Sequence, residues 1–182
     1  MPFRLTPTDA RPIRRVTTGK RGEMQLTAHL TASAKAGAGF AVKQHVPFAI
    51  VGSHADGTWV CRPLMRSSVD FVGVLAGGRS VWLECKSITP SRRLDGSFAP
   101  PRFPLSSLPE HQRATLASAH KLGAAAVVVL VVGTPATLYA VPWAVVARAL
   151  ERAAVSLLAD DVNAYRVPPT MTLLAFVARL GE

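Results

Sequence analysis

Two carboxylates and one ammonium group fall within a short stretch, residues 69–86, with the sequence V-D-F-V-G-V-L-A-G-G-R-S-V-W-L-E-C-K. Two runs rich in β-branched and aromatic residues flank an Ala-Gly-Gly turn, which predicts a β-hairpin. A hairpin centred on Gly77 places Asp70 directly opposite Glu84, on one face of the sheet, with Cβ atoms roughly 5 Å apart. Lys86 joins them, because residues two apart on a strand point to the same face.

Two carboxylates held this close repel each other unless a cation lies between them. Oxygen ligands are those that Mg²⁺ prefers, and an ammonium group beside the acids favours binding of a phosphate. The three side chains therefore predict a metal-dependent site that cleaves phosphodiesters. The alternative is an ordinary surface hairpin, whose charges are only solvated.

The spacing D-x(13)-E-x-K is similar to the signature of the PD-(D/E)XK nucleases, and the flanking sequence narrows the resemblance. Phe103-Pro104-Leu105 follows the hairpin, and His111-Gln112 then opens a predicted helix. With V-D-F-x-G-V and G-R before them, these motifs in this order resemble the RecU-type Holliday junction resolvases over about residues 20–143, with a phage-encoded relative as one possibility.

The resemblance implies an α/β fold with a restriction-endonuclease-like core, in which a mixed β-sheet is flanked by helices and carries a protruding β-stalk. Residues 1–20 hold five Lys and Arg and three prolines without periodicity, which predicts a basic, flexible N-terminal arm before a single nuclease domain (residues 21–182). Within that domain the resemblance makes residues 47–66 the candidate stalk, with a flat hairpin as the alternative, and the Ser-, Pro- and Arg-rich residues 88–102 predict a flexible basic loop.

By resemblance, Asp70 and Glu84 hold Mg²⁺ together with the main-chain carbonyl of Cys85, and Mn²⁺ is expected to substitute. Lys86 positions the attacking water or stabilises negative charge in the transition state, and Gln112 orients this network. The family commonly adds a glutamate on the first helix. Here only Glu23 lies nearby, so either it reaches the metal or the site works without it.

The implied reaction is the resolution of four-way DNA junctions by symmetric nicks. Because a junction is two-fold symmetric, a homodimer is expected. Two alternatives stay open: a nuclease of linear duplexes, of restriction or exonuclease type, and a junction-binding protein without catalysis.

Charge is concentrated in the first part of the chain. The net charge is +10, and residues 1–113 carry 16 Lys and Arg against 7 Asp and Glu. A basic half on an apolar scaffold favours a polyanion as partner. The candidate DNA-binding residues are Arg14, Arg15, Lys20, Arg21, Lys43, Trp59, Arg62, Arg66, Ser68, Arg79, Arg92, Arg93, Arg102 and His111.

Two cysteines without metal-ligand spacing, no signal-peptide pattern and no apolar run long enough for a membrane helix predict a soluble, cytoplasmic protein without a membrane partner.

Hydrophobic periodicity and Gly/Pro punctuation predict the remaining elements. Helices are expected over residues 21–36, with Leu26, Leu30 and Ala34 as the apolar stripe, over 105 or 107–122 with Ser107 as N-cap, over 142–154 and within 171–180. Strands are expected over residues 40–46, 124–132 and 137–141.

Overall fold

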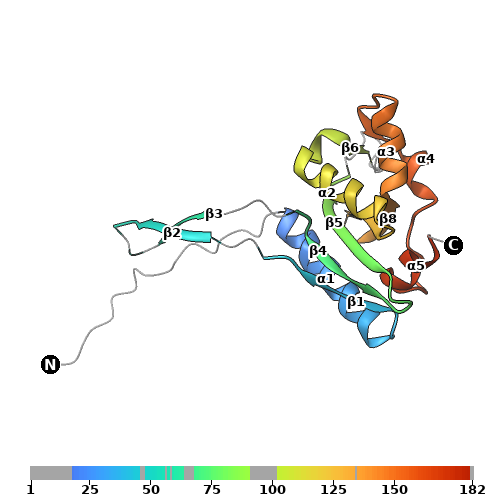
Figure 1. Ribbon diagram of the computed structural model, residues 1–182, viewed down its shortest axis with the longest axis horizontal. Coiled ribbons are helices and arrows are strands. Elements are labelled where there is room, and N and C mark those ends of the chain that lie inside the picture. The colour runs from blue at the N-terminus through green and yellow to red at the C-terminus, as the bar shows by residue number, and fades with distance from the viewer. Residues whose placement is uncertain are drawn as a thin grey trace.

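The computed structural model describes residues 18–45, 48–55, 57, 59–63, 68–90, 102–133 and 135–180. A five-stranded sheet runs through the body, in the order β1-β4-β5-β7-β8. Only β5 and β7 are parallel; the other neighbours are antiparallel, so the sheet is mixed, as predicted (Figure 1). The strands are β1 (Gly39–Lys43), β4 (Phe71–Leu75), β5 (Ser80–Ile88), β7 (Ala125–Val132) and β8 (Thr137–Pro142).

Helices cover both faces of this sheet. On one face, α1 (Thr18–Lys35) and α5 (Leu173–Arg179) pack against a cluster that includes Val127 and Val129. On the other, α2 (Glu110–Lys121) and α3 (Trp143–Glu151) pack against Val128 and Leu130. The short elements are β6 (Phe103–Pro104), η1 (Leu105–Ser107), β9 (Ser156–Leu157) and α4 (Ala159–Asn163).

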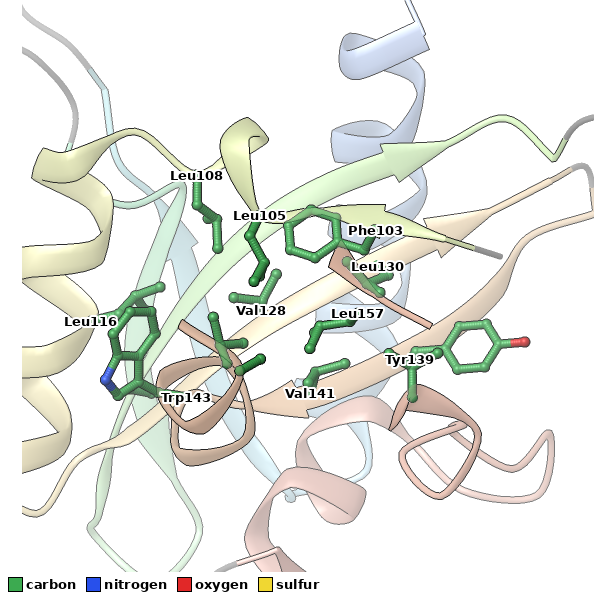
Figure 2. Packing of buried hydrophobic residues seen from close by; sticks show 14 of the residues in the cluster. Phe103, Leu105, Leu108, Leu116, Val128, Leu130, Tyr139, Val141, Trp143 and Leu157 are labelled. Atoms are coloured by element: carbon green, nitrogen blue, oxygen red, sulfur yellow. The ribbon is translucent and has the colours of Figure 1, made fainter. Parts of the chain in front are cut away.

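β7 is the centre of the hydrophobic core, because all eight of its residues are buried. Successive side chains on a strand point to opposite faces, so β7 supplies both clusters at once. Figure 2 shows its Val128 and Leu130 among side chains from other elements of the fold: Phe103, Leu105, Leu116, Val141, Trp143 and Leu157. The apolar run predicted as a central buried strand is confirmed.

Helix α1 spans 18 residues and buries Leu26 and Leu30 against the sheet, as predicted. The third member of the predicted stripe is wrong: Ala34 is exposed, and Ser33 is buried instead. Its hydroxyl donates to the His29 carbonyl and accepts from the Leu174 N–H, which satisfies a polar group inside the core. Of the helices that the structure describes, none is long and apolar enough to cross a bilayer.

The predicted start of α2 is also wrong. Ser107 belongs to the preceding 3₁₀ turn, where its hydroxyl donates to the Pro104 carbonyl, and the α-helix begins at Glu110 after Pro109. Proline is well suited to this boundary because its fixed φ fits an extended residue and a helix start alike. The predicted end holds, since Gly123 follows the helix with a positive φ of 85°.

Two further strands, β2 (Phe48–Ser53) and β3 (Trp59–Pro63), pair only with each other, in a separate antiparallel sheet. Figure 1 shows this hairpin projecting from the body of the molecule. Ile50, Val51 and Trp59 are more than half exposed on it. An apolar hairpin without a covering layer is unusual, because two strands alone bury little surface.

Candidate functional site

The β4–β5 hairpin has the register that places two acids face to face. Phe71 pairs with Leu83, so one further step along the strands sets Asp70 opposite Glu84. A three-residue loop closes the hairpin, and Gly78 has a φ of 81° there. Such loops use a left-handed residue, usually glycine, at this position. The predicted hairpin centred on Gly77 is confirmed.

Asp70 directly precedes β4, and its backbone and its side chain form hydrogen bonds with different segments. Its carbonyl accepts from the Gln44 N–H, and its Oδ2 accepts from the Cys85 N–H at 2.9 Å. Burial raises the pKa of the Asp70 carboxyl, and the nearby charge of Glu23 adds to this, whereas the Cys85 hydrogen bond and the Lys86 and Lys43 charges lower it.

The direction of the Cys85 backbone follows from this hydrogen bond. In a strand the N–H and C=O of one residue point to the same side, so the Cys85 carbonyl also faces the β4 side, toward Asp70. The Cys85 thiol lies in the core cluster between the sheet and α1, and its burial raises the pKa of Cys85 above the ordinary value. A metal at this site would therefore meet the Cys85 carbonyl and not its sulfur.

Glu84 is the most buried charged residue that the structure describes, with 1% of its surface exposed. Its Oε1 lies 2.8 Å from Nζ of Lys86, but its Oε2 is buried and has no hydrogen-bond partner. Burial raises the pKa of Glu84 to about 7; the Asp70 charge acts in the same direction, whereas the hydrogen-bonded Lys86 and the nearby Gln112 lower it. An uncompensated buried carboxylate oxygen is costly and calls for an explanation.

Lys86 links the strand to helix α2. Its Nζ contacts Glu84 and also donates to Oε1 of Gln112 at 3.1 Å, and the Lys86 side chain is 22% exposed. Gln112 lies in the first turn of α2, one turn before the buried Leu116, so the packing of that helix fixes the distance. The structure thus brings Asp70, Glu84, Lys86 and Gln112 together.

Glu23 lies close enough to this group to act on it by its charge. It lies on α1 and forms an ion pair with Lys43 of β1. Its charge still raises the Asp70 pKa, so a third acid contributes to the negative potential. Helix α1 comes this close because Gly22 lies directly over Ser87: a Cβ at Gly22 would sit 1.8 Å from the Ser87 hydroxyl.

The paired acids fit a divalent cation that takes only two side-chain ligands. A site with more side-chain ligands is absent from the part of the chain that the structure describes, where no group of three His, Cys, Asp or Glu side chains is placed to hold a metal. Mg²⁺ is usually held by one or two carboxylates, with waters and substrate phosphates completing its shell. Asp70, Glu84 and the Cys85 carbonyl match that donor set, and the Glu84 Oε2 without a partner is the atom that a cation would satisfy.

Several predicted DNA-binding residues have other contacts. Arg79 donates to the carbonyls of Gly123 and Ala124, in the turn between α2 and β7, and Arg102 donates to Ser156. Lys43 is paired with Glu23. The exposed candidates are Lys20, Arg21, Trp59, Arg62 and Ser68, and His111 is half-buried, with its Nδ1 buried and lacking a partner among the described atoms. Arg14, Arg15, Arg66, Arg92 and Arg93 lie outside the described residues.

One arginine that orders the site region was not predicted. Arg113 donates to the carbonyls of Leu105 and Leu108, and so ties the start of α2 to the turn before it. Gln112 is the adjacent residue, so this clamp also positions the partner of Lys86. The only signal for this role in the sequence is that Arg113 lies close to a predicted helix start.

Comparison of the chain with protein-family models and with curated proteins gave no match.

Proposed function

We propose that the protein is a Mg²⁺-dependent endonuclease that cleaves branched DNA. The observation that carries this proposal is the pair of opposed acids, Asp70 and Glu84, with a buried Glu84 Oε2 that no protein donor satisfies. A purely structural ion pair would be expected to satisfy both carboxylate oxygens, because each unpaired buried oxygen destabilises the fold.

Each residue has a role in this proposal. Asp70, Glu84 and the Cys85 carbonyl would hold Mg²⁺, which when bound supplies charge stabilisation at the scissile phosphate. Lys86 lies beside the acids and is partly exposed, so its ammonium group can reach a phosphate oxygen or the attacking water. Gln112 holds Lys86 in place through its Oε1.

The charge of the chain supports a nucleic acid as the substrate. A net charge of +10 favours a polyanion, and the β2–β3 hairpin presents Trp59, 65% exposed, and the exposed Arg62 on opposite faces of the same strand. An exposed aromatic ring can stack on unpaired bases, while a cation on the same hairpin can meet a phosphate. Such bases occur where duplexes branch.

The resemblance of the motifs to RecU-type resolvases extends the proposal to four-way junctions nicked symmetrically by a homodimer. Two alternatives remain candidates on the same residues. A linear-duplex nuclease would use the same acids, and a junction-binding protein would not use them at all. The projecting hairpin favours a branched substrate over a linear one.

The test compares a labelled four-way junction, a linear duplex and a single strand, each with Mg²⁺, Mn²⁺ or EDTA. We expect cation-dependent nicks in the junction, and loss of cleavage with retained junction binding in Asp70→Asn and Glu84→Gln. Asp160→Asn, which changes an exposed acid on α4, is the matched control and should cleave like the parent. Cleavage by either site variant at the parent rate would exclude this site, and a linear duplex cut as fast as the junction would favour the second candidate.

A further inference from the structure

Strand β1 is an edge of the five-stranded sheet, with β4 on one side only. The Gln44 N–H donates to the Asp70 carbonyl, and the Ala76 N–H to the Ala38 carbonyl, so even-numbered residues of this segment bond to β4. In an antiparallel pair, the backbone N–H and C=O groups of the residues between these point away from the neighbouring strand. The N–H and C=O groups of Gly39, Ala41 and Lys43 therefore point outward from the sheet.

Among the residues that the structure describes, this edge is only weakly protected: Lys43 is the single charged residue of the five in β1, and Glu23 is its counter-charge. No described backbone group bonds to the outward N–H and C=O groups of β1. Phe40 and Val42, on the face of β1 turned away from α1, are 54% and 56% exposed. Beside the strand, a groove of about 610 Å³ opens between β1 and α1. Its α1 lining is Thr27, Leu30, Thr31 and Ala34. A weakly protected, apolar edge strand is a surface for pairing with another strand.

We propose that β1 pairs with β1 of a second copy of this chain, antiparallel and centred on Ala41, to give one continuous ten-stranded sheet. The centred register is the one that pairs all five residues of the strand. It sets Phe40 opposite Val42 of the partner chain, so the two exposed apolar residues cover each other. Directly opposed apolar pairs are the unit that stabilises a sheet.

The charges of the edge fit a second copy. In the centred register Lys43 lies opposite a glycine, position 39 of the other chain, so the two lysines do not meet. Lys43 already has a local counter-charge in Glu23. A like-charge pair at the centre would oppose a homodimer of a protein with a net charge of +10, and this register has none.

The choice of a second copy also rests on the proposed function, which needs two sites related by a two-fold axis. Asp70 lies level with Gln44, so strand spacing and rise place the two Asp70 residues about 25 Å apart in the paired sheet. Because the axis is perpendicular to the sheet, both sites open on the same face. One branched substrate could then meet both.

The first test is the mass of the full chain in sedimentation equilibrium over a range of concentrations. We expect twice the 19.3 kDa chain mass for the parent, and a dissociation constant at least tenfold higher for Phe40→Lys/Val42→Lys. Val155→Lys/Leu158→Lys changes two apolar residues of similar exposure elsewhere and should leave the constant unchanged. A parent that stays monomeric, for instance because the edge is covered by residues 1–17 or bound only by a different protein, overturns the inference. So does a dimer that the β1 variant leaves intact.

A second test checks the register through cysteines, in a Cys61→Ser background. The double variant Phe40→Cys/Val42→Cys should form a disulfide-linked dimer, because positions 40 and 42 of opposite chains face each other. Either single cysteine should not, since its own copy would lie about 8 Å away between Cα atoms, beyond disulfide range. Equal cross-linking by a single variant would contradict the centred register.

These results separate the inference from the proposed function. A β1-paired dimer that cleaves no DNA in any cation would keep the inference and reject the nuclease. A cation-dependent nuclease whose dimer is unchanged by the β1 substitutions would keep the proposed function and reject the inference. If both hold, the lysine variant should still make single nicks but lose the paired cleavage of both strands.

Discussion

The carboxylate of Asp70 accepts a hydrogen bond from the backbone N–H of Cys85, at 2.9 Å and just past the last residue pair of β4 and β5. The side chain therefore occupies a position in the ladder where a backbone carbonyl is expected. Asp70→Asn keeps an acceptor oxygen and should unfold at nearly the parent's urea midpoint. Asp70→Ala leaves the Cys85 N–H unpaired and should lose about 1–2 kcal/mol. Equal midpoints for Asn and Ala would mean that this bond contributes nothing to stability.

The raised pKa of Glu84 makes the stability of the metal-free protein depend on pH. The pKa of Glu84 is about 7 in the folded protein, above its ordinary value of 4.5, so between these values the folded state binds more protons than the unfolded state. The free energy of unfolding should therefore fall as pH rises from 4.5 to 7, by up to about 3 kcal/mol. Asp70, whose pKa is also raised, adds to the fall in the same direction.

Urea unfolding in EDTA at pH 5 and pH 8 measures this difference, and Glu84→Gln should flatten it. The matched control is Asp160→Asn, whose carboxyl is exposed in the parent. An unchanged slope in Glu84→Gln would show that the buried carboxyl is not the group that titrates.

Much of this hairpin could be predicted because its geometry is local. The alternation of residues along two strands and the glycines between them determine which residues are opposed, so Asp70 and Glu84 could be paired from the sequence. Contacts between distant segments could not. Arg79 is 44 residues from Gly123, and no local pattern indicates that its guanidinium binds the turn after α2 rather than facing solvent. The burial of Ser33 rather than Ala34 could not be predicted for the same reason, since the Leu174 N–H that bonds to the Ser33 hydroxyl lies 141 residues away.

Gln112 is expected to act on the reaction by holding Lys86, the side chain to which it is hydrogen-bonded. Gln112→Ala removes the Oε1 acceptor at 3.1 Å, so the ammonium group gains freedom to leave the position beside Glu84. We expect kcat for junction nicking to fall by about tenfold, within the usual range for a lost positioning contact, while Mn²⁺ affinity changes less than twofold. Gln25→Ala, on α1, serves as the control for loss of a glutamine elsewhere. A fall in metal affinity with kcat unchanged would assign Gln112 to the metal instead.

The close approach of α1 to β5 at Gly22 predicts an intolerant position. Gly22→Ala forces a Cβ against the Ser87 hydroxyl, and overpacking of this kind costs about 1–3 kcal/mol. Ser87→Ala removes a buried hydroxyl without a hydrogen-bond partner, so it should not destabilise the protein. The double variant should then lose less than the sum of the two single changes, measured as a double-mutant cycle in urea. Strict additivity would mean that the two residues do not contact each other.

Trp59 tests whether the projecting hairpin recognises branched DNA. The indole is 65% exposed and the hairpin pairs with no strand of the body, so Trp59→Ala should leave the thermal unfolding midpoint of the protein within about 2 °C. Loss of base stacking should weaken junction binding by about 1–3 kcal/mol, or roughly 5–150-fold, with little change for linear duplex. Competition between the two DNAs, with Val155→Ala as an exposed apolar control, measures the ratio. If Trp59→Ala weakens both DNAs equally, the hairpin adds general affinity and branch selectivity must come from the spacing of the two active sites.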